Sequence, residues 1–135
     1  MVGSEHTYTS TGGAVFGQKN TISAASATVT GGYQNTASGA FASVSGGLSN
    51  EAAGDQASVT GGAGNIASDT GASVSGGQAN KASNLYASVS GGFTNVANGD
   101  YASVSGGYQN TASAFYASVT GGQNKDANTN YQNLP

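Results

Sequence analysis

One six-residue phrase returns along almost the entire chain at a fixed interval. It reads Ala-Ser-Val-Ser-Gly-Gly at residues 42–47, and its copies begin fifteen residues apart, at Ala27, Ala42, Ala57, Ala72, Ala87, Ala102 and Ala117. A unit of this length is too short to bury a core by itself. The strict period therefore predicts a solenoid, in which each repeat forms one coil that stacks on its neighbours.

Alternation within the phrase predicts a β-strand. Ala42 and Val44 fall on one side of an extended chain, which we expect to face inward, while Ser43 and Ser45 fall on the other side. The Gly-Gly pair then permits a turn. A second short strand is expected over residues 50–52, and the Ser-Gly pair at 38–39 forms the return corner. A helix is disfavoured, because two glycines in each repeat cost about 2 kcal/mol relative to alanine.

Stacked coils place equivalent residues above one another in fifteen columns, numbered here with Ala42 in the first. The third is the valine column, the expected core: Val29, Val44, Val59, Val74, Val89, Val104 and Val119. The ninth is the asparagine column: Asn20, Asn35, Asn50, Asn65, Asn80, Asn95 and Asn110. We expect each asparagine amide to pass a hydrogen bond to the asparagines above and below it, which makes a ladder along the turns.

The repeat defines the domain organisation. Residues 12–135 form the β-roll repeat domain of about eight to nine coils, and residues 1–11 are expected to be an irregular N-terminal segment or an added start. In the fifteen-residue frame, residues 12–17 occupy the first copy of the phrase, with Phe16 and Gly17 in place of Gly-Gly. The single histidine, His6, lies in the irregular segment, and no catalytic role is expected for it.

The composition disfavours several classes of function. The net charge is −3 with three lysines and no arginine, which argues against nucleic-acid binding. The acidic residues Glu51, Asp55, Asp69 and Asp100 fall in several columns, unlike the paired carboxylates of glycosidases or the acids of calcium-binding repeats. There is no cysteine, and no apolar segment approaches the ~20 residues of a membrane span. We therefore expect no enzyme activity, no metal site, no cofactor and no membrane insertion.

The core of a single chain is thin. One valine and two alanines per coil contribute about 1–2 kcal/mol on burial, and the ordering of fifteen residues opposes this gain. Aromatic side chains of the seventh and fifteenth columns are therefore candidates for burial between chains of a homo-oligomer. These candidate interface residues are Tyr33, Phe41, Tyr86, Phe93, Tyr101, Tyr108 and Tyr116.

Hydroxyl side chains fill the second and fourth columns. These hydroxyl columns comprise Thr28, Thr30, Ser43, Ser45, Ser58, Thr60, Ser73, Ser75, Ser88, Ser90, Ser103, Ser105, Ser118 and Thr120. Small polar residues suit any solvated or chain-to-chain sheet face. The pattern is also similar to the Thr-x-Thr ladders of β-helical antifreeze proteins, which implies a candidate ice-binding or ligand-binding face.

Two segments carry a further resemblance. Residues 35–47 read Asn-Thr-Ala-Ser-Gly-Ala-Phe-Ala-Ser-Val-Ser-Gly-Gly, and residues 95–107 read Asn-Val-Ala-Asn-Gly-Asp-Tyr-Ala-Ser-Val-Ser-Gly-Gly. They resemble the head repeats of YadA-like trimeric autotransporter adhesins and are similar to the Gly-Gly-rich repeats of tail-fibre-like proteins. The resemblance covers about residues 12–131.

What this resemblance implies is an all-β fold, a left-handed parallel β-roll or β-helix solenoid with fifteen-residue coils that packs as a side-by-side homotrimer. It also implies display at a bacterial cell surface or on a virion fibre, and attachment to a host-surface or matrix receptor. Three functions stay open from the sequence: an adhesin or tail-fibre module, an ice-binding solenoid, and the subunit of a self-assembling extracellular filament.

Overall fold

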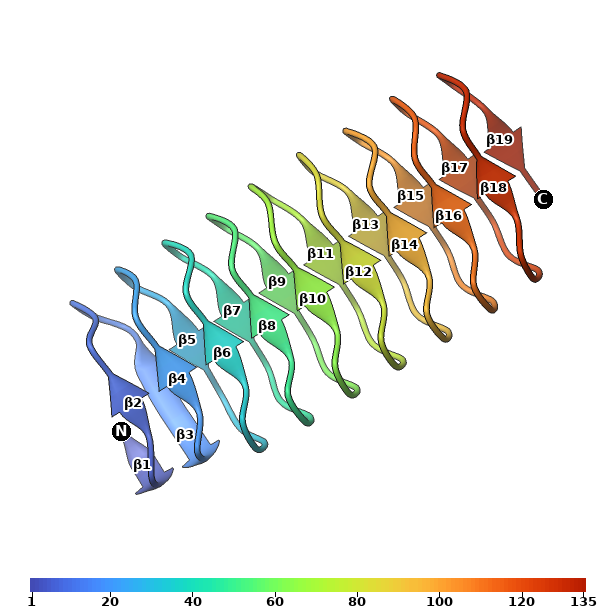
Figure 1. Ribbon diagram of the computed structural model, residues 1–135. Helices are drawn as coiled ribbons and strands as arrows, with labels where there is room; N and C mark the ends of the chain where they lie inside the picture. Colours follow the sequence, from blue (N-terminus) through green and yellow to red (C-terminus); the bar gives the residue numbers. More distant parts are fainter.

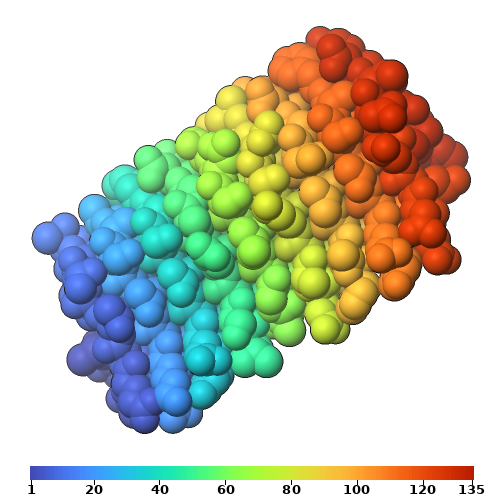
Figure 2. Space-filling model, viewed as in Figure 1, coloured from blue at the N-terminus to red at the C-terminus, as the bar shows by residue number.

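The computed structural model describes residues 1–135 and consists of short β-strands joined by turns. Successive coils stack along one axis, with the two termini at opposite ends of the rod (Figure 1). In the space-filling view the sequence colours form successive bands across the rod, because each coil packs against the coils before and after it (Figure 2). The fold is a parallel β-solenoid of about nine turns without any helix.

Each coil contributes one strand to each of two parallel sheets. The first sheet contains β1 (Val2–Ser4), β3 (Ala14–Gln18), β5 (Thr28–Val29), β7 (Ser43–Val44), β9 (Ser58–Val59), β11 (Ser73–Val74), β13 (Ser88–Val89), β15 (Ser103–Val104), β17 (Ser118–Val119) and β19 (Asn133–Leu134). The second sheet contains β2 (Thr7–Tyr8), β4 (Thr21–Ile22), β6 (Thr36–Ala37), β8 (Glu51–Ala52), β10 (Ile66–Ala67), β12 (Lys81–Ala82), β14 (Val96–Ala97), β16 (Thr111–Ala112) and β18 (Asp126–Ala127).

The strands pair in the register that the repeat predicts. Ser43 pairs with Ser58 and Val44 with Val59, and the same fifteen-residue offset continues along the rod. The strand expected over residues 50–52 is β8, which begins one residue later, at Glu51. Equivalent residues of successive coils therefore lie directly above one another.

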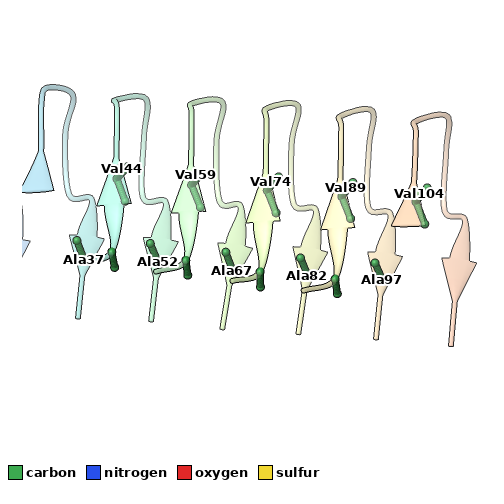
Figure 3. Close-up of a cluster of buried hydrophobic side chains, with 14 of the residues drawn as sticks. Ala37, Val44, Ala52, Val59, Ala67, Val74, Ala82, Val89, Ala97 and Val104 are labelled. Atoms are coloured by element: carbon green, nitrogen blue, oxygen red, sulfur yellow. The ribbon is translucent and has the colours of Figure 1, made fainter. Parts of the chain in front are cut away.

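The core consists of three columns of small apolar side chains that lie between the two sheets. All seven residues of the valine column are buried, with at most 1% of each exposed. They face the alanines of the eleventh column, such as Ala37, Ala52 and Ala67, as Figure 3 shows. The alanines of the first column complete this core. Alternation within the phrase thus places Ala and Val inside and the hydroxyl residues outside.

The first coil differs from the expected frame. Strands β1 and β2 lie within residues 1–11, which were expected to be irregular, and both join the sheets. Their pairs are fourteen residues apart, as in Val2 with Phe16, and the same offset pairs Val15 with Val29. By Gln18, which bridges to Tyr33, the offset is fifteen. The segment between Val15 and Gln18 is therefore one residue shorter than the equivalent segment of the next coil. A shift of one residue exchanges the two sides of a strand, and here it places Val15 in the buried valine column.

The coil turns its corners with left-handed residues at three columns. The second glycine of each Gly-Gly pair has a positive φ, as Gly77 does at 81°. So does every residue of the eighth column, among them Thr94 at 56°, and every residue of the fifteenth from Ser26 onward, among them Tyr101 at 58°. Most of these residues in the eighth and fifteenth columns are not glycine. Closure of the coil, more than the type of residue, therefore sets the backbone at these two corners.

Thr94 provides a test of this conclusion. A β-branched residue at positive φ is strained, and a left-handed residue other than glycine costs about 1–2 kcal/mol. We expect Thr94→Gly to raise the free energy of unfolding by about 1 kcal/mol. Thr111→Gly, in strand β16 where φ is not positive, should lower it by a similar amount. Urea unfolding followed by circular dichroism measures both, and a loss of stability in T94G would contradict the assignment.

Candidate functional site

The surface of the rod is organised as columns on two faces and two edges. The hydroxyl columns lie on the outer face of the first sheet, and the tenth column lies on the outer face of the second. The turn between the two strands of a coil carries the seventh column, and the return turn carries the fifteenth. The two columns of candidate interface residues therefore occupy opposite edges of the flattened coil.

The asparagine column lies inside the first of these turns and is buried throughout. The Asn65 Nδ2 group donates to the carbonyl oxygens of Gly61 at 2.8 Å and Gly77 at 3.0 Å. Its Oδ1 atom accepts from the backbone N–H of Asn80 at 2.9 Å. Every asparagine from Asn35 to Asn95 repeats this pattern. Each side chain thus joins its own turn to the turn of the next coil.

The ladder differs in one respect from the sequence prediction. The amides do not bond to one another: each side chain bonds to main-chain groups of its own coil and of the next coil. A side-chain amide inside a turn meets unpaired backbone groups on both sides, and burial makes it costly to leave those groups without partners. No buried side-chain polar atom of the chain lacks a hydrogen bond.

The single histidine forms the first rung of this ladder. Thr7 pairs with Thr21, so His6 stands below Asn20 in the asparagine column. Its Nδ1 atom accepts from the backbone N–H of Asn20 at 3.2 Å, and Nε2 lies 3.1 Å from the carbonyl oxygen of Val2. With its proton on Nε2, the ring makes the same two kinds of bond as an asparagine. Sequence reasoning missed this role, because the fourteen-residue offset hides His6 from the fifteen-residue column.

The two glycines of each pair have different roles. A side chain on Gly77 would overlap the carbonyl oxygen of Gly92 and approach Asn80 Nδ2 to 2.6 Å. A side chain on Gly76 would meet nothing within 4 Å, and the φ of Gly76 is not positive. The second glycine is therefore required by the close approach of stacked turns, whereas the stereochemistry of a single chain does not require the first.

The hydroxyl columns form an ordered polar face. Residues of the second column, such as Ser88, are half-buried, and residues of the fourth, such as Ser90, are exposed. Among these fourteen side chains, Thr30, Ser118 and Thr120 donate hydrogen bonds within the chain. The other hydroxyl groups are free to bond to water or to a ligand.

The fifteenth column carries a continuous aromatic stack in its C-terminal half. The rings of Tyr86, Tyr101, Tyr116 and Tyr131 lie face to face, with centroids 5.6, 4.8 and 5.6 Å apart. Phe115 packs edge-on against the last three of them. On the opposite edge, the rings of the seventh-column residues Phe93 and Tyr108 stack at 5.5 Å. All of these rings are substantially exposed in the single chain.

The stacked tyrosines are held in a costly backbone conformation. Their φ angles lie between 51° and 60°, which costs about 1–2 kcal/mol for a residue with a side chain. A stacked aromatic pair contributes about 0.5–1.5 kcal/mol. The two effects largely offset each other, so the tyrosines add little net stability to one chain.

Charged side chains form no concentrated site. Lys19 Nζ lies 3.3 Å from Glu5 Oε2 and 5.5 Å from the centre of the Tyr33 ring. The Tyr33 side chain and the Glu5 carboxylate raise the pKa of Lys19. No three His, Asp or Glu side chains are grouped so that they could hold a metal ion, and the surface has no pocket.

Comparison with protein-family models and with curated proteins finds no match for this chain. The structure contains no helix with the length and apolar character needed to cross a membrane.

Proposed function

We propose that this chain is a non-enzymatic structural and adhesive module, a segment of a bacterial cell-surface adhesin or tail fibre displayed outside the cell. The observation that carries the proposal is the repetition of the same exposed side chains along the rod, coil after coil. A surface of this kind presents many equal contacts to a receptor at a host surface or in a matrix. Weak contacts made at several coils together give strong attachment.

The proposal includes a left-handed winding and a homotrimer of rods side by side. Exposed aromatic rings on two opposite edges support the trimer, because a closed ring of three joins two different patches of each chain. The seventh column of one chain, with Phe93 and Tyr108, would then meet the fifteenth column of the next, with Tyr101 and Tyr116. The thin core supports the same conclusion, since contacts between chains would add the apolar burial that one chain lacks.

The state of assembly is tested by light scattering at several concentrations. We expect a constant mass of three 13.0 kDa chains. Tyr101→Ser combined with Tyr116→Ser should shift this mass toward one chain without loss of solubility, because both rings leave the proposed interface. Gln56→Ser, in the same column but without an aromatic ring, is the matched control. A clean monomer before substitution would refute the trimer, and a mass that grows with concentration would favour a filament.

Adhesion is tested separately, with beads that carry the chain and flow over a coating of basement-membrane extract. We expect beads with the full rod to be retained and beads with albumin to be washed away. Beads with a sparse coating of the chain should detach at much lower flow, since attachment depends on many simultaneous contacts. Equal retention of albumin beads would contradict an adhesive role.

Ice binding is a second candidate, favoured by the two hydroxyl columns on one sheet. Their residues repeat in strict register from β5 to β17. Under this alternative the chain shows thermal hysteresis, and Ser88→Tyr combined with Ser103→Tyr abolishes it without unfolding, because the rings break the regular face. Under the adhesin proposal the unmodified chain shows no hysteresis.

A further inference from the structure

Four tyrosines of one chain stack in successive coils, and this arrangement has a chemical consequence beyond the proposed function. We propose that the stack is a site of oxidative modification, at which a haem peroxidase with hydrogen peroxide joins Tyr101 to Tyr116 through a dityrosine bond. The proposal does not depend on adhesion, because both rings belong to the same chain. It requires that the rings are exposed, and the proposed trimer would cover Tyr101 and Tyr116, so the two proposals predict different reactivity for the assembled protein.

Geometry selects this pair among all tyrosines of the molecule. The Tyr101 and Tyr116 rings are nearly parallel, at 6°, and their centroids are 4.8 Å apart. The neighbouring pairs in the stack are wider, at 5.6 Å. When each ring rotates about its Cβ–Cγ bond, the two rings meet edge to edge and no longer face to face. The carbons beside the two hydroxyl groups, at which phenoxyl radicals couple, then lie next to each other.

The stack is accessible in the single chain. Tyr101 is 39% exposed, Tyr116 47% and Tyr131 71%. Phe115 packs edge-on against all three rings and keeps them together. An electron removed at Tyr131 can therefore be replaced from its neighbours in the stack, so that the radical reaches the closest pair.

No other side chain of the protein competes strongly for the oxidant. The chain has no cysteine and no tryptophan, and its one methionine is Met1, so the side chains that usually capture oxidants are almost absent. The remaining tyrosines have no tyrosine neighbour. Tyr108 stacks on Phe93, which has no hydroxyl group to form a phenoxyl radical, and Tyr33 is followed in its column by Leu48.

The reaction balances with one molecule of peroxide. Each tyrosine loses one electron and its phenolic proton, and the two phenoxyl radicals form a carbon–carbon bond beside their oxygens. The hydrogens on the two coupled carbons then move to the oxygens, which restores both aromatic rings and both hydroxyl groups. Hydrogen peroxide takes up the two electrons and two protons and becomes two molecules of water. The product is a covalent bond between two coils that are fifteen residues apart.

The experiment treats the dilute full chain with a haem peroxidase and equimolar hydrogen peroxide. We expect the mass of the single chain to fall by two hydrogens, with dityrosine fluorescence and a linked peptide pair that contains Tyr101 and Tyr116. The double variant Y101F/Y116F keeps the stacked rings and loses the reactive phenols, so we expect it to lose the dityrosine signal. The double variant Y33F/Y108F removes two tyrosines that lie outside the stack and should retain the signal.

Several outcomes would overturn the proposal. Absence of dityrosine in the unmodified chain is one. Bonds formed only between chains, seen as chains of doubled mass on a denaturing gel, are another. An equal loss of signal in the two double variants would show that the coupling is not directed by the stack. Light scattering on the same samples reports the state of assembly. Trimers that still form the Tyr101–Tyr116 bond would contradict the placement of these rings between chains, and single chains that form no bond would overturn the present proposal.

Discussion

Replacing Gly77 with alanine should destabilise the rod by about 3 kcal/mol, whereas the same replacement at Gly76 should leave its stability nearly unchanged. A methyl group on Gly77 would overlap the carbonyl oxygen of Gly92 and reach within 2.6 Å of Asn80 Nδ2. It would also stand at φ 81°, in the left-handed region. At Gly76 the same methyl group meets nothing within 4 Å. Comparison of G76A with G77A therefore distinguishes the close packing of the second glycine from the general flexibility of a Gly-Gly turn.

The measurement is urea unfolding of the unmodified chain, G76A and G77A, followed by circular dichroism. Hydrogen exchange then locates the coils that lose stability. Each coil of a solenoid is stabilised by its neighbours, so the exchange protection of residues around Gly77 and Gly92 should fall most in G77A. Protection in the first coils should change little. Equal stability of G76A and G77A would show that the stacked turns can move apart, and would contradict the close approach described above.

Replacing Asn65 with leucine should cost about 2–6 kcal/mol, the second large effect. The leucine side chain has a similar size, but it leaves the backbone N–H of Asn80 and the carbonyl oxygen of Gly61 without their partners. An unpaired buried backbone group costs about 1–3 kcal/mol. Asn98→Leu is the matched control, since Asn98 is exposed. Thermal unfolding compares the two variants, and similar melting temperatures would refute the ladder as a main source of stability.

Asn65→Asp tests the direction of the same hydrogen bonds. The carboxylate still accepts from Asn80 N–H, but it faces the carbonyl oxygens of Gly61 and Gly77 without a proton to donate. Burial and these two oxygens raise the pKa of the new carboxyl group in the folded state. The folded state therefore binds the proton more tightly than the unfolded state, and the stability of N65D rises as the pH falls from 7 toward about 4. A variant whose stability falls over this range would contradict the assignment of Nδ2 as the donor.

Much of the fold follows from the sequence because its period is strict. The fifteen-residue interval implies stacked coils, and the alternation of Ala42, Ser43, Val44 and Ser45 predicts a strand with its apolar side inside. Both features can be found in the sequence, because the alternation involves adjacent residues and the interval is a fixed number of residues. The asparagine column is also visible in the sequence, which predicts a ladder of hydrogen bonds along the turns.

The tertiary structure alone decided how the coils contact one another. The partners of Asn65, the different roles of Gly76 and Gly77, and the left-handed backbone of Thr94 and Tyr101 depend on the distance and angle between stacked turns. The fourteen-residue first coil and the place of His6 depend on which register buries Val15. These contacts join residues that lie a whole coil apart in the sequence. The geometry of the closed, stacked coils determines them, and the local residue pattern does not.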